Sequence, residues 1–482
     1  MRTSTLVVLV MIAVSGCKLG PDYVRPVVKT PSAWRIDYPE AVEVANTKWW
    51  EQFGDPVLNE LIEKALRENL DVRIAAARVE QFAGALVATR SQLFPQIGYS
   101  GDVSRFQASR VGIPAIPSPA NRNFTLYEAS LGASWQLDLF GRVRRLSEAA
   151  QAQVYASEQA QHGVVLSLVT SVATSYIGLR AFDRQLEIAQ GTAKNFGETA
   201  RIFDLRFKSG IVSQLEVNQI RSQYQLALAA IPGFEQAIAA QENLISILLG
   251  GNPEAIPRGK TIDQLIPPLI PTGLPSTLLE RRPDILQAEQ NLVATNANIG
   301  ATRALYYPNI SVTGLLGSAS TVFSDFLTQP ANMWALAANV SGPIFTFGGI
   351  KGQVTAAEAQ NEQALLFYRQ TILNAFRETN DALVGSQKTI EIVAMQQERV
   401  VALREFARLS RLRFDKGLAG YLEVLIAEND LFAAELASVG FLASRYTQLI
   451  NVYQAMGGGW VDVADSMTAK PQGIAAAAPP VH

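Results

Sequence analysis

The chain has 482 residues, of which 48% are hydrophobic and 17% charged, and its formal net charge at pH 7 is −2. This composition provides enough apolar sequence for a large core. The lack of a basic excess excludes a protein that binds nucleic acid through its phosphates.

The first predicted element is an export signal. An apolar run over residues 6–14 precedes Cys17, the single cysteine of the chain. A run of about nine residues is too short for a bilayer core, which needs about 20 apolar residues. The pattern resembles a lipoprotein signal peptide over 1–16, and it predicts an acylated N-terminus at Cys17 and a lipid-anchored extended segment over 17–53. Lys18 favours the outer membrane, and an ordinary signal peptide beside a buried cysteine is the alternative.

A helix over 56–93 leads into the first predicted strands. From Tyr127 to Leu139 apolar residues occupy the odd positions and polar residues the even ones, and 96–104 alternates in the same way. A period of two gives a strand one apolar and one polar face. The proline-rich stretch 112–123 is expected to be an exposed hairpin tip.

A second predicted hairpin follows later in the chain, with weaker alternation from Ile310 and over 334–344 and a tip at 324–332. Aromatic residues gather at the other ends of the strands: Phe94, Phe140, Tyr306, Tyr307, Phe345 and Phe347. An apolar outer face closed by an aromatic belt predicts a transmembrane barrel, whereas a half-buried sheet of a soluble protein is the alternative.

Long helices are predicted for most of the remaining chain. No proline interrupts 141–208, whose apolar positions follow heptad-like spacing. About 67 helical residues make a rod of about 100 Å. Gly210 permits a reversal, after which helix resumes over 213–249. Apolar stripes rich in Ala and Ser predict that such rods pack side by side as the wall of a tube. No segment after the signal is expected to supply the about 20 apolar residues of a membrane-spanning helix.

The chain is a tandem duplication. The pattern R-F-x-x-G-x-x-x-x-L-E-V begins at Arg206 and again at Arg413, 207 residues later. FGRVRRLSEAAQAQ and FGGIKGQVTAAEAQ have the same offset, whereas LFPQI and YYPNI are 213 residues apart. The second copy is therefore expected to repeat the rod over 348–414, turn at Gly417 and return to residue 456. The predicted segments after residue 53 are repeat 1 over 54–249, a Pro/Gly-rich equatorial linker over 250–279, repeat 2 over 280–457, and a C-terminal segment with a disordered tail over 458–482.

Four strands per chain cannot close a barrel. An open sheet edge in lipid leaves backbone groups unpaired, at several kcal/mol each. Two chains would supply about eight strands, whose bore fills with side chains, and three would supply about twelve, which leave a lumen. The polar strand face requires water, so a trimer is predicted.

Several stretches resemble a known family over most of the chain, from Cys17 to Trp460: CKLGPDYVRP, KWWEQFGDPVLNELI, LLERRPDILQAEQNLVATNANIGATRALYYPNI and YQAMGGGW. They are similar to signatures of the TolC-like outer-membrane factors, and within them of the NodT-type efflux lipoproteins. The resemblance implies an α+β membrane protein that assembles as a homotrimer, with a 12-stranded β-barrel in the outer membrane and an α-helical tunnel through the periplasm.

The same resemblance implies the function. It predicts a passive exit duct for small molecules such as drugs, docked to a periplasmic adaptor protein and to an inner-membrane pump of the resistance-nodulation-division class. Two alternatives are a type I protein-secretion conduit and a lipid-anchored periplasmic coiled-coil scaffold. The sequence does not name the substrate.

The two R-F-x-x-G stretches are expected to form the far tips of the tube. In the family these tips carry the closed aperture and the adaptor contact, so Gly210 and Gly417 are candidate adaptor-contact turns. Glu216 and Glu423 are candidates for a carboxylate ring at the aperture, which would attract cations. The alternative is that each is a helix-start residue favoured by the helix dipole.

Other tip residues leave the nature of the aperture open. Where some relatives carry a second acid, this chain has Ile426, with Glu428 further along, so a double acidic ring is in doubt. Tyr421 and Leu422 could form an apolar constriction instead. Arg206 and Arg413 are candidates for tethering neighbouring coils, and otherwise they lie on solvated faces.

No catalytic chemistry is predicted. The chain has two histidines, His162 and His482, and it lacks H-E-x-x-H, G-x-S-x-G, G-x-x-x-x-G-K-[ST] and G-x-G-x-x-G. We therefore expect no enzyme, no cofactor and no metal site. His162 is expected to be a surface residue.

Overall fold

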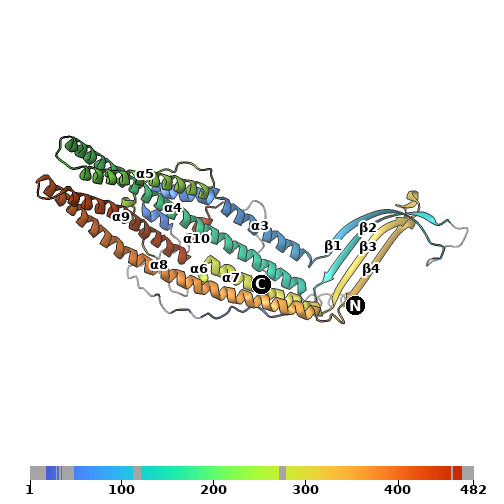
Figure 1. The fold of residues 1–482 in the computed structure, drawn as a ribbon. Coiled ribbons are helices and arrows are strands. Elements are labelled where there is room, and N and C mark those ends of the chain that lie inside the picture. Colours follow the sequence, from blue (N-terminus) through green and yellow to red (C-terminus); the bar gives the residue numbers. More distant parts are fainter. Residues whose placement is uncertain are drawn as a thin grey trace.

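The computed structural model describes residues 18–28, 30–31, 34, 48–111, 121–270, 278–457 and 460–468. The predicted signal peptide, Cys17, most of the first hairpin tip and the C-terminal tail lie outside the described residues. Figure 1 shows an elongated molecule with the sheet at one end and the tips of the helical hairpins at the other.

The sheet is antiparallel in the order β1-β2-β3-β4. Its strands are β1 (Gln96–Gln107), β2 (Asn123–Leu137), β3 (Asn309–Ser320) and β4 (Asn332–Ser341). The register brings Tyr99, Leu131, Leu316 and Trp334 into one row across the sheet. All four side chains are more than half exposed. One face of the sheet is therefore apolar and uncovered, which confirms the predicted alternation.

The strand boundaries differ from the alternating stretches. β2 ends at Leu137, because the carboxylate of Asp138 leaves the strand to cap the next helix. Its oxygens accept from the backbone N–H groups of Val143 at 3.0 Å and Arg144 at 2.9 Å. The second hairpin tip contains two short 3-10 helices, η5 (Phe323–Asp325) and η6 (Gln329–Ala331).

Two helical hairpins extend from the sheet to the far end. The first consists of α4 (Arg142–Lys208) and α5 (Gln214–Leu248), and the second of α8 (Gly349–Asp415) and α9 (Tyr421–Ala455). The outgoing helices have 67 residues each and the returning helices 35 each. The predicted rods and turns are confirmed, and each element of the second hairpin repeats one of the first.

The predicted continuous helix over 56–93 is wrong. The structure has α2 (Pro56–Glu68) and α3 (Leu70–Ser91), separated by Asn69 in an extended conformation. The Asn69 side chain accepts from Val72 N–H at 3.1 Å and donates to the Leu248 carbonyl at 2.9 Å. It therefore caps the start of α3 and the end of α5 together. We call this contact the first joint.

A second joint occupies the equivalent place in repeat 2. Arg282 separates α6 (Leu278–Arg281) from α7 (Pro283–Arg303), which ends in η4 (Ala304–Tyr306). Its guanidinium donates to the Ala455 carbonyl, at the end of α9, at 2.9 Å. Leu248 and Ala455 are 207 residues apart, and Asn69 and Arg282 are 213 apart. Both spacings match the offsets found in the sequence.

An equatorial belt covers one face of the helices at mid-length. It consists of η1 (Trp49–Phe53), α2, residues 250–270 with η2 (Ile262–Gln264), and α10 (Trp460–Asp465). Trp49 is fully buried and stacks on Tyr453 of α9 with a centroid distance of 5.0 Å. The belt core also includes Tyr176 and Tyr446. Aromatic burial therefore fixes the belt on α4 and α9.

One expectation about membrane helices needs correction. α4 contains a window long and apolar enough to cross a membrane, but 72% of that window is buried within the protomer. The buried side chains include Val165, Val169 and Val172, which pack in the belt core. The apolar composition of α4 is therefore explained by its central place in the wall, where it contacts α3, α5, α7 and α9.

Residues 18–28 form an extended strap against α4 and α7. Arg145, only 1% exposed, donates to the Leu19 carbonyl and to the Asp22 carboxylate, each at 2.8 Å. Lys18 pairs with Glu148 at 2.6 Å. These contacts place the start of the strap beside the first turns of α4, next to the sheet.

Candidate functional site

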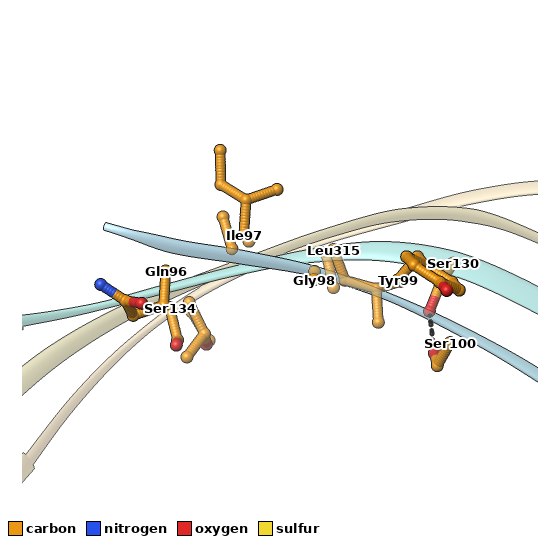
Figure 2. Close-up of a pocket in the computed structure, with 14 residues that line it drawn as sticks. Gln96, Ile97, Gly98, Tyr99, Ser100, Ser130, Ser134 and Leu315 are labelled. Carbon is orange, nitrogen blue, oxygen red and sulfur yellow. Dashed lines mark hydrogen bonds between the residues drawn. The ribbon is translucent and has the colours of Figure 1, made fainter. Parts of the chain in front are cut away.

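The polar face of the sheet is one candidate site. Figure 2 shows a hollow on this face, where the hydroxyls of Ser100 and Ser130 lie 2.8 Å apart. The hollow has a volume of about 670 Å³. Small residues from all four strands line it, among them Gly132, Thr313 and Ala335. Gln96 and Leu315 are larger lining residues, and the small residues between them leave this face open to water.

The two sheet faces also differ in charge. Asp102 and Glu128 are cross-strand partners on the polar face, and they are the charged residues of that face in the described strands. On the apolar face the strands carry one charge, Arg105. The polar face is therefore weakly acidic, and the apolar face suits lipid.

Exposed aromatic side chains mark the boundary between sheet and helices. Phe345 is 84% exposed and Phe94 64%. Phe140 stacks on Tyr307 with a centroid distance of 4.8 Å. The predicted aromatic belt thus lies together in space, at the level where a membrane interface favours such rings.

The hairpin tips are the second candidate site, and both have the same turn. Gly210 and Gly417 each have φ of +73°. Ile211 N–H donates to the Arg206 carbonyl and Leu418 N–H to the Arg413 carbonyl, each at 2.9 Å. These are the bonds of a Schellman motif, which requires the left-handed conformation that glycine adopts at low cost. The R-x-x-x-G spacing of the repeat follows from this geometry.

Glu216 and Glu423 have different surroundings. Glu216 forms a capping box with Ser213, whose backbone N–H donates to its carboxylate at 2.7 Å. Glu423 follows Gly420, which has no capping side chain. Arg413 instead donates to the Glu423 carboxylate at 2.9 Å. Glu216 therefore has the geometry of a helix-start residue, whereas Glu423 ties α9 to α8.

An aromatic cluster joins the two hairpins near their tips. Tyr421 of α9 lies 4.3 Å from Phe203 of α4 and 5.2 Å from Phe414 of α8, measured between ring centroids. The Arg206 guanidinium lies 5.9 Å from the Phe414 ring, within cation–π range. Arg206 thus reaches from the first hairpin to the second within the protomer.

The same cluster bears on the apolar constriction considered above. Tyr421 is 2% exposed and Leu422 53% exposed, so Leu422 alone of the pair presents its side chain to solvent. Burial raises the pKa of Tyr421 to about 12. Phe203 is not predicted from the sequence, because no local pattern shows that it faces a residue more than 200 positions away.

Apolar side chains are also exposed around the turns. Ile211, Leu215 and Leu418 are each more than 60% exposed, and Ile426 is 50% exposed. Such a patch on a solvated tip is typical of a protein contact surface. Glu428, the acid further along, is held by Arg411 at 3.4 Å, and burial raises its pKa.

His162 is not the plain surface residue expected. It is half-buried, and its Nε2 lies 3.7 Å from the Asp465 carboxylate of α10. Its pKa is raised by the hydrogen bond with Asp465. The other histidine lies outside the described residues. Among those that the structure does describe, no group of three or more His, Cys, Asp or Glu could hold a metal ion.

Comparisons with known proteins give consistent findings. The sequence profile described as "Outer membrane efflux protein" matches residues 61–251 and 274–458. The cation efflux system protein CusC of Escherichia coli is 33% identical over 457 residues, covering 94% of this chain and 97% of CusC. The toluene efflux pump outer membrane protein TtgI of Pseudomonas putida is 31% identical over 468 residues, covering 95% of this chain and 99% of TtgI.

Solved structures agree. The crystal structure of CusC, 31% identical, superposes with a TM-score of 0.82 and covers 92% of this chain and 100% of CusC. The crystal structure of the open state of the Neisseria gonorrhoeae MtrE outer membrane channel, 28% identical, superposes with a TM-score of 0.83. The match covers 92% of this chain and 99% of the MtrE chain.

Proposed function

Because the chain belongs to the outer membrane efflux protein family, we propose that three copies of it enclose a duct for small organic molecules. Membership makes the protein an outer-membrane channel that extends into the periplasm, the exit duct of a tripartite efflux system, and not an enzyme. The predicted fold class, a trimeric barrel with a helical tunnel, agrees with the solved channels.

The main observation in support of a trimer is that the sheet of the protomer is open at both edges. Within the protomer β1 and β4 each lack a neighbour on one side, yet the apolar face between them is exposed. In lipid, unpaired strand edges cost several kcal/mol per backbone group, so β4 of one copy must pair with β1 of the next. Three copies give a closed barrel of about twelve strands with room for water.

The helical edges support the same assembly. α8 forms one edge of the wall and has exposed apolar side chains along its length, among them Leu373 and Val401. The opposite edge, made by α3 and α5, exposes Val87 and Ile247. Packing α8 of one copy on α3 and α5 of the next would bury both sets.

The tips are proposed to hold the aperture. Arg206 and Tyr421 hold the two hairpins together, and the Arg413–Glu423 pair closes the second hairpin. The exposed apolar turns at Gly210 and Gly417 are proposed to contact the periplasmic adaptor. The pump is proposed to be of the resistance-nodulation-division class, and Cys17 to carry acyl chains that enter the inner leaflet beside the strap.

The substrate class is the finer part of the proposal. The names of relatives of similar identity mention toluene, antibiotics and cations, so overall similarity does not separate these classes. We favour organic molecules, because the described residues lack a group of three or more His, Cys, Asp or Glu that could hold a metal ion.

The test is to purify the full-length protein from outer membranes, measure its mass in detergent and record its conductance in planar bilayers. A trimer that conducts ions is expected. A stable monomer, or a trimer with no conductance under any voltage, would refute the duct. Deleting the gene should also sensitise cells to organic compounds, with plasmid-borne wild type as the control.

A further inference from the structure

A polar groove lies over the second joint. It has a volume of about 620 Å³ and is lined by residues of α4, α7, α8 and α9. The lining includes Arg282 and Asp284 at the start of α7, Arg377, Glu378 and Asp381 of α8, and Gln448, Asn451 and Gln454 of α9. A cavity of this size with convergent polar groups has the dimensions of a small-molecule site.

In the proposed trimer the groove borders the tunnel. Tyr446, Ile450 and Tyr453 of α9 pack in the core of the equatorial belt. Gln448 and Asn451 lie on the opposite side of the same helix, since residues advance by about 100° along an α-helix. A belt inside the tube would fill the tunnel, so the belt lies outside it. The opposite face of α9, with the groove, therefore borders the conducted space.

The charged side chains of the groove differ in how closely they are paired with one another. Arg282 is 9% exposed at its side chain, and it is held by Asp284 at 2.7 Å, Glu378 at 2.8 Å and the Ala455 carbonyl at 2.9 Å. Arg377 meets Glu378 at 3.5 Å and Asp381 at 3.6 Å, both long contacts. Asp381 is 69% exposed at its side chain, so its carboxylate is open to a ligand.

The remaining polar groups favour a hydrogen-bonding ligand. No hydrogen bond between described residues engages the side-chain amides of Gln448, Asn451 or Gln454. The groove is lined by three carboxylates and two guanidiniums, and the guanidinium of Arg282 already bonds two carboxylates and a carbonyl. The local excess is therefore negative, and amide oxygens are available to accept from a bound donor.

We propose that this groove is a transit site for protonated organic amines moving through the tunnel. The site rests on the proposed duct and narrows its substrate class. Asp381 would pair with the ammonium group, and the amides of α9 would accept from its remaining N–H donors. Arg377 borders the site and would disfavour a second cation.

The test uses two probes of equal length and opposite charge, 1,6-diaminohexane and adipate, on wild-type trimers in planar bilayers. Each is added on the barrel side, from which it reaches the groove without passing the hairpin tips. The diamine should reduce the current, and Asp381→Asn should weaken this block about three- to fivefold, the effect of losing one exposed charge pair. Arg377→Gln should strengthen it, and adipate should have little effect.

Glu391→Gln is the matched control. It removes one negative charge from the same helix, but Glu391 is paired with Lys388 at 2.8 Å and does not line the groove. Equal block in wild type and Asp381→Asn would overturn the site. Block by adipate that Arg377→Gln relieves would overturn the choice of cations. A wild type without conductance would overturn the duct and the site together, whereas conduction with an unaltered block would overturn the site alone.

Discussion

Glu216 and Glu423 stand at equivalent positions of the two repeats, yet their carboxylates have different partners. Glu216 accepts from Ser213 within its own helix start, whereas Glu423 accepts from Arg413 of the neighbouring helix. An exposed ion pair contributes up to about 1 kcal/mol. At the residue scale, identical letters in a repeat therefore do not imply identical roles.

The two glutamates provide a matched pair of variants. We expect Glu423→Gln to raise single-channel conductance and weaken cation preference, because Arg413 loses its partner and the aperture loses a carboxylate. Glu216→Gln should change both less, since a neutral amide can still cap its own helix. Reversal potentials in salt gradients provide the measurement. Equal effects of the two variants would contradict this distinction.

His162 predicts a pH response at the equatorial belt. Its pKa lies above the ordinary value of 6.5 because of the hydrogen bond to Asp465, with Asp462 and Glu158 nearby. A raised folded-state pKa means that the stabilisation is complete below about pH 6.5 and is lost as the pH rises through the folded value. Protection of α10 amides from hydrogen exchange should therefore fall on going from acid to alkaline pH.

The control for this response is His162→Gln, which keeps a hydrogen-bonding side chain without the titration. Its protection factors for α10, corrected for the intrinsic exchange rate, should not depend on pH over the same range. A wild type with the same flat profile would show that the contact with Asp465 contributes nothing.

At the scale of elements, the two faces of β2 supply the clearest contrast. Leu131 belongs to the exposed apolar row, and Ser130 to the polar face, where it meets Ser100. Leu131→Arg should cost about 2 to 4 kcal/mol if the residue lies near the bilayer midplane. The yield of folded trimers in outer membranes measures this loss.

The companion variant is Ser130→Arg. It places the same side chain one residue away, on the face that borders water, so it should insert and instead lower the conductance. Equal trimer yields for the two variants would show that this part of the sheet does not contact lipid.

The aromatic cluster at the tips also acts between elements, since it joins the two hairpins. Tyr421→Ala removes a buried aromatic side chain and should cost about 3 to 5 kcal/mol of local stability. The hairpins would then separate more readily, and conductance should rise. Leu422→Ala is the control, because Leu422 is exposed in the protomer. A larger effect of Leu422→Ala would favour an apolar constriction over the cluster.

The sequence predicted the elements better than their contacts. Periodicity identified the strands and the rods, and the 207-residue offset predicted that α8 and α9 would repeat α4 and α5. The break at Asn69 was missed, because asparagine inside an apolar-periodic stretch gives no local sign that its amide bonds the end of α5. The Phe203–Tyr421 contact was missed for the same reason, since it depends on how two distant hairpins pack.

At the scale of the whole molecule, the strap is held on the protein by contacts that do not depend on the proposed lipid anchor. Membrane anchoring and trimer assembly should therefore be separable. Arg145 holds residues 19–22 through backbone and carboxylate contacts that need no acyl chain. Cys17→Ser should therefore reduce membrane anchoring but leave trimers intact, because the barrel remains inserted once folded. Membrane fractionation and native gels test this, with mass spectrometry of the mature N-terminus to show the acylation. Loss of trimers in Cys17→Ser would contradict it.

The two joints differ in one respect that matters for how such a chain can evolve. In repeat 1 the carbonyl at the end of α5 accepts from the neutral amide of Asn69, and in repeat 2 the carbonyl at the end of α9 accepts from the charged guanidinium of Arg282. Each chain contains two different hairpins, so a trimer contains three copies of each. A substitution in one half of the gene therefore changes three of the six hairpins and leaves the other three unchanged. In a ring of six identical half-length chains, one substitution would change all six hairpins. The duplicated chain can therefore acquire a new ligand-facing charge in one half while the other half preserves the original structure.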